Sequence, residues 1–347
     1  MVSIAHVAMV AMLVSVSWMS CGPKKTTGKP LKSQLSGAAD DDAKSTPSDD
    51  KPPSRPPDVG SKSPPPDTHA GADTSAKPDL QLGPDEDDGE ISILTLNMQT
   101  GFNDGEEIAV RTRVVADFIK KHLPDAVALQ EVSETTNNYI NQGQKLKKMT
   151  GYEFEWRQTH RVPLYYEEGI AVLSRWPIDS TSSASLPHRD LGGSISRAIF
   201  EASIDHPTIP FQVFVTHMTV VSSESVKNDQ AKAVSAFVDE NQSEDFALLA
   251  GDMNAKPDST AMQFLRGRAE IDGESAGFTD AWLAVREANP GPTHPADSPK
   301  KRIDYIYVTE TPRSSPTKNC RRVFKKPHDD VWASDHLGVF CTFEIDE

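Results

Sequence analysis

Basic residues are scarce in this chain of 347 residues, and this limits how it can bind phosphate-rich partners. The formal net charge is −15, from 36 Lys and Arg against 51 Asp and Glu. Such a chain gains little from non-specific attraction to the phosphates of duplex nucleic acid. A phosphorylated substrate remains compatible with this charge if a divalent cation supplies positive charge locally.

Positive charge is absent altogether from residues 1–21, which contain no Lys or Arg. The apolar stretch Val7–Val16 is typical of a secretory signal peptide, although such peptides normally begin with a basic segment. Cys21 follows a small residue, as at the acylation site of bacterial lipoproteins, whereas Trp18 and Met19 match that site poorly. We expect residues 1–20 to be a signal peptide and the protein to be exported, with a lipid on Cys21 anchoring it to a membrane. Ordinary cleavage and an uncleaved anchor are the alternatives.

Aromatic residues are missing from residues 22–90, which hold 12 of the 26 prolines. A segment of this composition cannot bury enough apolar surface to offset the entropy lost on ordering. We therefore expect residues 21–90 to be a disordered tether and residues 91–347 to fold as one domain.

Cysteine is rare, and only Cys320 and Cys341 follow Cys21. In an oxidising exterior these two could form a disulfide. Cys341 lies in an apolar run near the C-terminus, GVFCTFEI, so a buried free thiol is the alternative.

From Ile91 onwards, apolar residues are spaced as in strands and amphipathic helices. The spacing predicts helices over Glu106–Leu123 and Ser222–Asn241 and strands over Ile91–Leu96, Ala126–Leu129, Gly169–Leu173, Phe211–Val215, Phe246–Ala250, Ile303–Val308 and Gly338–Ile345. Strands and helices alternate only in part, and several links are too short for crossovers. A mixed α/β domain is therefore predicted. No internal repeat of fixed period is visible.

Polar residues stand at the ends of these strands. Those that follow a strand are Asn97, Glu131, His217, Asp252 and Asn254. Active sites of open α/β sheets lie outside the carboxyl ends of strands, so we expect these residues to converge. Asp304 lies early in its strand, and Asp335 and His336 precede theirs, which fits antiparallel entry from the same edge. Carboxylates gathered there repel one another unless a divalent cation or a substrate phosphate lies among them.

Each of these features alone has an ordinary structural interpretation. A Gly-Asp pair after a strand is usually a turn, His217 alone would be a core histidine, and Asp304 could form a salt bridge with Arg302. Their occurrence together is more informative. The motifs LTLN, LQEV, THM, GDMN, RIDY and SDH, in this order, resemble those of the endonuclease/exonuclease/phosphatase superfamily, and PDAVALQEV, GIAVLSRWPI and TDAW are also similar to it. The resemblance covers residues 91–347. It implies a deoxyribonuclease I-like, four-layer α/β sandwich, in which two mixed β-sheets pack face to face with flanking helices.

The same resemblance implies a metal-dependent phosphoester hydrolase. Glu131 would bind Mg²⁺, with Asn97 and Asp335 as further ligands or as groups that orient the ligands. Mn²⁺ is an alternative, and one or two ions could act. Mg²⁺ takes few protein ligands and keeps several waters, which suits this set. A second ion could bind at Asp252, Asn254 and His336.

The resemblance also assigns catalytic roles. Asp304 would orient His336, while Asp252 and Asn254 would contact the attacking water and the scissile phosphate. His217 would donate to the phosphate or protonate the leaving oxygen. Either Asp252 or His336 could be the base that activates water.

Two further charged residues, Glu168 and Arg197, could contribute to the site. Arg197 is similar to an arginine of relatives, but a structural ion pair is the preferred interpretation. Glu168 would support His217.

The substrate is less clearly indicated. Val132 and Ser133 follow LQE where abasic-site endonucleases usually carry Lys, which argues against abasic-site repair. The run Lys301–Asp304 differs from that of inositol 5-phosphatases, which argues against that activity. Secreted sphingomyelinases share the pattern at Gly169–Ile178, but they usually also have an exposed aromatic hairpin for membrane contact. The sequence shows no such hairpin, and Phe324 and Trp332 beside Lys325 and Lys326 replace it poorly. The basic clusters Lys300–Arg302 and Arg321–Lys326 could follow a phosphate backbone or be solvated loop charges.

We therefore expect a monomeric, exported endonuclease or phosphodiesterase that cleaves nucleic acid by metal-assisted attack of water. A sphingomyelinase-like or other phospholipid or sugar phosphoesterase is the first alternative. The second is a non-catalytic binding module displayed at the cell surface, which would carry degraded ligand positions, and none of the main positions is degraded.

Overall fold

The computed structural model describes residues 89–99, 105–134, 141–162, 166–190, 195–287, 289–309 and 316–345. The predicted signal peptide, Cys21 and nearly all of the predicted tether lie outside these residues. Among the described helices, none is both long and apolar enough to cross a membrane.

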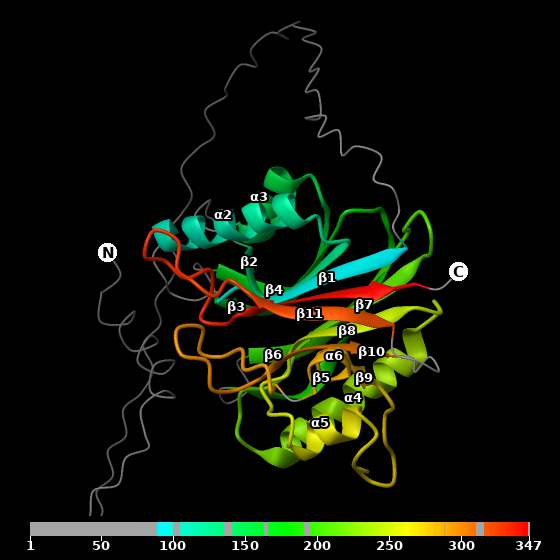
Figure 1. Cartoon of the computed structure of the whole chain (residues 1–347). Coiled ribbons are helices and arrows are strands. Elements are labelled where there is room, and N and C mark those ends of the chain that lie inside the picture. Colours follow the sequence, from blue (N-terminus) through cyan, green and yellow to red (C-terminus); the bar gives the residue numbers. More distant parts are fainter. Residues whose placement is uncertain are drawn as a thin grey trace, which may run out of the picture. The chain divides into compact units, whose positions relative to one another are not determined.

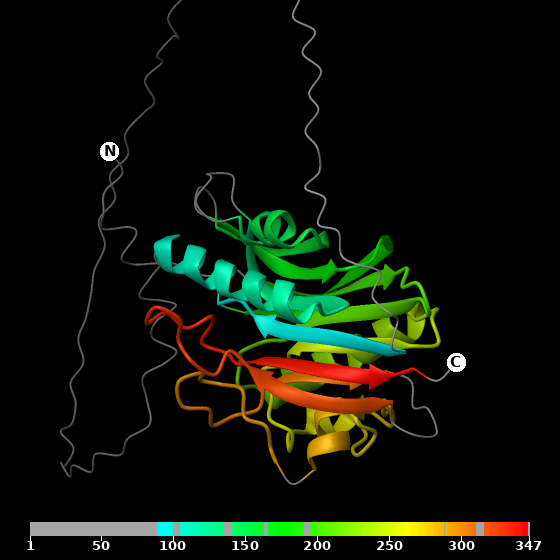
Figure 2. The ribbon, with the colours of Figure 1, turned by 45° about the horizontal axis from the view of Figure 1, so that its top comes forward.

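The first of two six-stranded sheets has the strand order β11-β12-β1-β2-β4-β3. Its strands are β1 (Glu90–Asn97), β2 (Ala126–Glu134), β3 (Glu153–Val162), β4 (Tyr166–Ser174), β11 (Thr317–Val323) and β12 (Gly338–Glu344). β1 and β2 are parallel, and α2 (Gly105–His122) lies between them in the chain; the other neighbours are antiparallel. Figure 2 shows β1, in cyan, beside β12, in red, so the two ends of the domain are joined by this sheet.

The second sheet has the order β5-β6-β7-β8-β10-β9. Its strands are β5 (Ile178–Asp190), β6 (Ile195–Ile204), β7 (Phe211–His217), β8 (Ala247–Asp252), β9 (Thr279–Asp280) and β10 (Asp304–Val308). Here too one pair, β7 and β8, is parallel, with α4 (Glu224–Asn241) between them in the chain. Each sheet therefore contains one parallel strand pair joined through a helix, β1-α2-β2 in the first and β7-α4-β8 in the second, although the sequence shows no internal repeat.

The helices form the outer layers (Figure 1). α2 and α3 (Gln142–Thr150) lie on one side of the sheets, and α4 and α5 (Thr260–Leu265) lie on the other. α6 (Ala281–Arg286) follows β9 directly. Apolar side chains fill each interface: Ile93, Val172, Val215 and Ile306 between the sheets, Leu96, Val115 and Leu146 under α2 and α3, and Leu249, Val234 and Leu265 under α4 and α5. The four-layer sandwich implied by the resemblance is confirmed.

The seven predicted strands and two predicted helices are present, with bounds that differ by a few residues. Five strands and three helices were not predicted: β3, β5, β6, β9, β11, α3, α5 and α6. Cys320 and Cys341 lie opposite each other in β11 and β12 and form a disulfide, which decides between the two alternatives for these cysteines.

Candidate active site

The register of three neighbouring strands brings His217, Asp252 and Asp304 side by side. His217 ends β7 and pairs with Asp252 at the end of β8, and Asp252 pairs with Asp304 at the start of β10. Gly251 makes this close pairing possible, because a Cβ there would lie 2.0 Å from the backbone oxygen of Thr216. The glycine of the GDMN motif thus serves packing, and the aspartate after it reaches the site.

Glu131 reaches the same site from the other sheet. The sequence predicted that it follows the end of a strand, and this is wrong, because β2 continues to Glu134. The pairing of β2 with β4 shifts between Leu129 and Val132, and Glu131 has a φ of 52°. Such a β-bulge redirects a side chain without ending the strand, and bulges are common beside active sites.

Asn97 connects the two sheets. Its Nδ2 atom donates hydrogen bonds to Oε1 of Glu131, at 3.0 Å, and to Oδ2 of Asp252, at 3.2 Å. Its Oδ1 atom accepts a hydrogen bond from the backbone N–H of Gln99, at 2.9 Å. Asn97 therefore holds one carboxylate of each sheet in a fixed position relative to the other.

Asp304 and His336 form the buried pair that the resemblance implies. Nδ1 of His336 lies 3.1 and 3.0 Å from the two carboxylate oxygens of Asp304, which is 1% exposed. Burial opposes charging of His336, but the carboxylates of Asp304 and Asp252 outweigh it and raise the pKa of the imidazole to about 10. With Nδ1 committed to Asp304, Nε2 is the atom that faces the site, 3.8 Å from Oδ2 of Asp252.

Arg197 fixes the proton of His217. The sequence favoured a structural ion pair for this arginine, but its NH1 group lies 2.9 Å from Nδ1 of His217. A guanidinium has only donors, so Nδ1 must accept and the proton of the neutral ring sits on Nε2. Burial, with the charges of Arg197 and His336, lowers the pKa of His217 well below its ordinary value. His217 thus presents a neutral N–H donor to the site.

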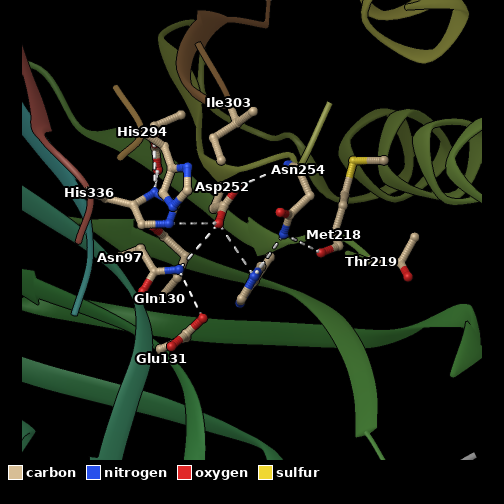
Figure 3. Close-up of polar contacts among 12 residues, drawn as sticks. Asn97, Gln130, Glu131, Met218, Thr219, Asp252, Asn254, His294, Ile303 and His336 are labelled. Atoms are coloured by element: carbon tan, nitrogen blue, oxygen red, sulfur yellow. Dashed lines mark hydrogen bonds and ion pairs between the residues drawn. The ribbon is translucent and has the colours of Figure 1, made fainter. Parts of the chain in front are cut away.

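Asp252 lies at the centre of the cluster (Figure 3). Its Oδ1 atom accepts from the backbone N–H of Asn254, at 2.8 Å, and its Oδ2 atom lies 3.5 Å from Nε2 of His217. The side chain of Asn254 donates to the carbonyl of Met218 and lies 3.1 Å from Nε2 of His217. Burial raises the pKa of Asp252 to about 6, although the imidazole of His336 and the hydrogen bond from Asn254 oppose the rise.

The region around Glu131 holds more negative than positive charge. Burial, together with the carboxylates of Glu168 and Asp335, raises the pKa of Glu131 to about 8. Burial also raises the pKa of Glu168, and Arg197 opposes it. A dication would relieve this repulsion, and the carboxylates of Glu131 and Asp335 are the oxygen ligands that Mg²⁺ prefers, while Asn97 turns its Nδ2 toward the site and orients Glu131. The residues present therefore fit the expected metal.

Glu168 was predicted to support His217. The structure places it close enough to Glu131 and Arg197 for electrostatic interaction, and Arg197 in turn contacts His217. The proposed salt bridge between Asp304 and Arg302 is absent, because Arg302 pairs with Asp280 at 2.6 and 3.0 Å.

His294 is a site residue that the sequence analysis missed. It is 4% exposed, and its ring lies beside that of His336, with centroids 4.7 Å apart (Figure 3). It belongs to no predicted strand, and only its position ten residues before Asp304 could have drawn attention to it.

Comparisons with known proteins agree with this geometry. The model of the Endonuclease/Exonuclease/phosphatase family matches residues 94–336. The chain belongs to this family. Its members are in general metal-dependent hydrolases of phosphoester bonds. Among curated relatives, the uncharacterized protein YbhP of Escherichia coli strain K12 is 25% identical over 263 residues, which are 71% of this chain and 96% of that protein.

Solved structures share the fold. A family protein from Leptotrichia buccalis superposes with a TM-score of 0.59 at 22% identity, covering 74% of this chain and 100% of that one. TDP2 from D. rerio, complexed with a single-strand DNA product, gives 0.57 at 19% identity, covering 74% and 99%. A family protein from Bacteroides vulgatus gives the same TM-score and the same identity, with the same coverage. At these identities the similarity shows the fold alone.

Proposed function

We propose that this protein is a Mg²⁺-dependent phosphodiesterase whose substrate is nucleic acid. The observation that supports the hydrolase is the contact network that joins Asn97, Glu131, Asp252, Asp304 and His336, from both sheets, at one edge. Structural carboxylates gain nothing from being buried together, whereas a metal-assisted hydrolase needs them there.

Glu131 and Asp335 would hold the ion, with Asn97 orienting Glu131 through its Nδ2–H. Bound there, Mg²⁺ would neutralise charge on the non-bridging oxygens of the scissile phosphate. Glu131 comes from β2 and Asp335 from the segment before β12, and these two strands lie on either side of β1, which carries Asn97.

The protein's own groups carry the proton transfers. We assign Asp252 as the acceptor of the proton from the attacking water, because His336, between Asp304 and Asp252, already holds its own proton. His336 then acts as a donor to the phosphate through Nε2. His217 donates through its Nε2–H, and Asn254 donates beside it. Donors fixed in advance stabilise the charge that develops in the transition state.

A pocket next to these residues supports nucleic acid as the substrate. It has a volume of about 430 Å³ and is lined by one aromatic residue, two cations, one carboxylate and four apolar residues: Trp332, Arg322, Lys325, Asp297, Leu337, Ala296, Pro292 and Pro299. Leu337 directly follows His336, and Ala296 lies two residues after His294. An aromatic face beside two cations suits a base and its phosphate, and TDP2, which shares the fold, was solved with a single-strand DNA product.

The N-terminal segment supports a location outside the cytoplasm. We propose that the protein is exported and carries a lipid on Cys21, on the strength of the apolar stretch before that residue. Incorporation of labelled fatty acid into the wild-type protein but not into Cys21→Ser would agree with this, and equal labelling of both proteins would contradict it.

A substrate panel tests the proposed function. Single-stranded and duplex DNA, RNA, sphingomyelin vesicles and inositol phosphates are offered with Mg²⁺ and then with EDTA. We expect cleavage of nucleic acid that disappears with EDTA and in Asp252→Ala and His336→Ala. Release of phosphocholine from sphingomyelin without nuclease activity would contradict the assigned substrate. Full activity of His336→Ala would contradict the assigned site, and no hydrolysis of any substrate would favour the binding module.

A further inference from the structure

The loop that carries His294 is hydrogen-bonded through its backbone to the segment that carries Asp335 and His336. The backbone N–H of Ala296 donates to the carbonyl of Asp335 at 2.7 Å, and that of Leu337 donates to the carbonyl of Thr293 at 2.8 Å. The backbone of His294 also pairs with Lys301 across the loop. These bonds hold the buried imidazole of His294 beside the site, where the mechanism above gives it no role.

We propose that His294, Asp335 and His336 form a site for a first-row transition-metal dication. Each offers a ligand atom within 4.8 Å of the other two. Nε2 of His294 lies 3.9 Å from one oxygen of Asp335, and Nε2 of His336 lies 4.0 Å from the other. These separations are too long for hydrogen bonds. Ligand atoms that share one ion at about 2.1 Å lie roughly 3 to 4 Å apart, so only a small movement is needed.

The surroundings of the three residues fit a bound ion. A metal-binding histidine usually gives its second ring nitrogen to a carboxylate, which fixes the orientation of the ring. His336 has this arrangement, since Nδ1 lies against Asp304, and an ion bound at Nε2 would take the place of the proton that His336 otherwise holds there. The side chain of Asp335 is 37% exposed, so it can adjust and leaves an approach from solvent.

The ligand set determines which ion is preferred. Imidazole suits Zn²⁺, Cu²⁺, Fe²⁺ and Ni²⁺, whereas Mg²⁺ and Mn²⁺ prefer oxygen ligands. Two imidazoles and one carboxylate therefore favour a transition metal over Mg²⁺, in contrast to the oxygen ligands around Glu131. This inference goes beyond the proposed function, because such an ion would bind whether or not the protein hydrolyses phosphodiesters.

Zn²⁺ titration of the full-length, metal-stripped protein tests the site. Calorimetry is carried out with wild type, His294→Asn and the control His122→Asn, whose histidine lies away from the site. We expect His294→Asn to weaken Zn²⁺ binding at least as much as loss of an outer-shell partner does, about 10- to 100-fold. Mg²⁺ binding should not change, and the control should resemble wild type. Equal Zn²⁺ affinity in wild type and His294→Asn would overturn the proposal.

A second measurement needs no variant and covers the case in which His294→Asn does not fold. Co²⁺ added to the wild-type protein should give two strongly shifted ring N–H NMR signals, one from each coordinated histidine, and the visible absorption of nitrogen-bound cobalt. Shifted signals from one ring or from none would overturn the proposal. If the protein hydrolyses phosphodiesters with Mg²⁺ but does not bind Zn²⁺ through His294, only this inference is refuted. If it binds Zn²⁺ there but hydrolyses nothing, only the proposed function is refuted.

Discussion

Replacing Asp304 by Asn would remove the charge that holds His336 while keeping the shape of the side chain. Both oxygens of Asp304 lie within 3.1 Å of Nδ1 of His336, and both residues are buried. A hydrogen bond to a charged group contributes about 1.5 to 3 kcal/mol, and a change of one in pKa corresponds to about 1.4 kcal/mol. In Asp304→Asn we therefore expect the pKa of His336 to fall from about 10 by roughly 1 to 2.

The effect on catalysis follows from the role of His336. Loss of one fixed donor to the phosphate costs about 10²- to 10³-fold, so kcat should fall within that range, while KM should change little because Asp304 is placed behind the histidine. Since Asp304 acts through His336, the double variant Asp304→Asn/His336→Ala should be no slower than His336→Ala. Steady-state kinetics gives the rates, and NMR titration of the metal-free protein gives the pKa.

The same pair predicts how stability depends on pH. The folded-state pKa of His336, about 10, lies above its ordinary value of 6.5, so the folded protein binds the extra proton between these pH values. Its contribution to stability is complete below pH 6.5 and is lost as the pH rises through about 10. Asp304→Asn should flatten this decline in urea denaturation. A variant that keeps the pKa of His336, keeps kcat within about tenfold of wild type, or loses activity additively with His336→Ala would refute the account of this pair.

Three further predictions concern other positions. Asp280→Ala should destabilise the fold by about 3 to 5 kcal/mol in urea denaturation, because it leaves Arg302 charged and buried; a loss below about 1 kcal/mol would contradict this. Arg197→Met should let the proton of His217 move to Nδ1, seen by ¹⁵N NMR, and lower kcat with partial rescue by Arg197→Lys; an unchanged tautomer would show that the arginine does not set it. Gly251→Ala should cost at least about 1 to 3 kcal/mol, because its Cβ would meet backbone, and wild-type stability of this variant would disprove the close packing.

The sequence predicted the central strands because their apolar runs are long and end in polar residues. β3, β5, β9 and β11 are all edge strands. An edge strand is exposed on one side and carries polar residues, as in IDSTSSASLPHRD of β5, so its apolar signal is weak. β6 is central but is interrupted by Arg197 and Glu201, which are buried in polar contacts.

The convergence of His217, Asp252, Asp304 and His336 was predictable because each of them stands at or beside a strand boundary in a recognisable motif. What could not be predicted depends on backbone geometry and on long-range contacts. No local pattern distinguishes the bulge that redirects Glu131 from a strand end. Arg197 and His294 meet the site through contacts with residues 20 and 42 positions away, His217 and His336. The sequence favoured an ion pair at Arg197, and no local pattern indicates its contact with His217.

The central claim is that the converging carboxylates form a metal-dependent hydrolytic site. The most direct test is the rate of bis-p-nitrophenyl phosphate hydrolysis by the metal-stripped protein as Mg²⁺ is restored, for wild type and for Glu131→Gln. We expect no hydrolysis without metal, full recovery in wild type, and recovery in Glu131→Gln only at much higher Mg²⁺ concentration. Hydrolysis that is independent of Mg²⁺, or an identical Mg²⁺ dependence in both proteins, would contradict the claim.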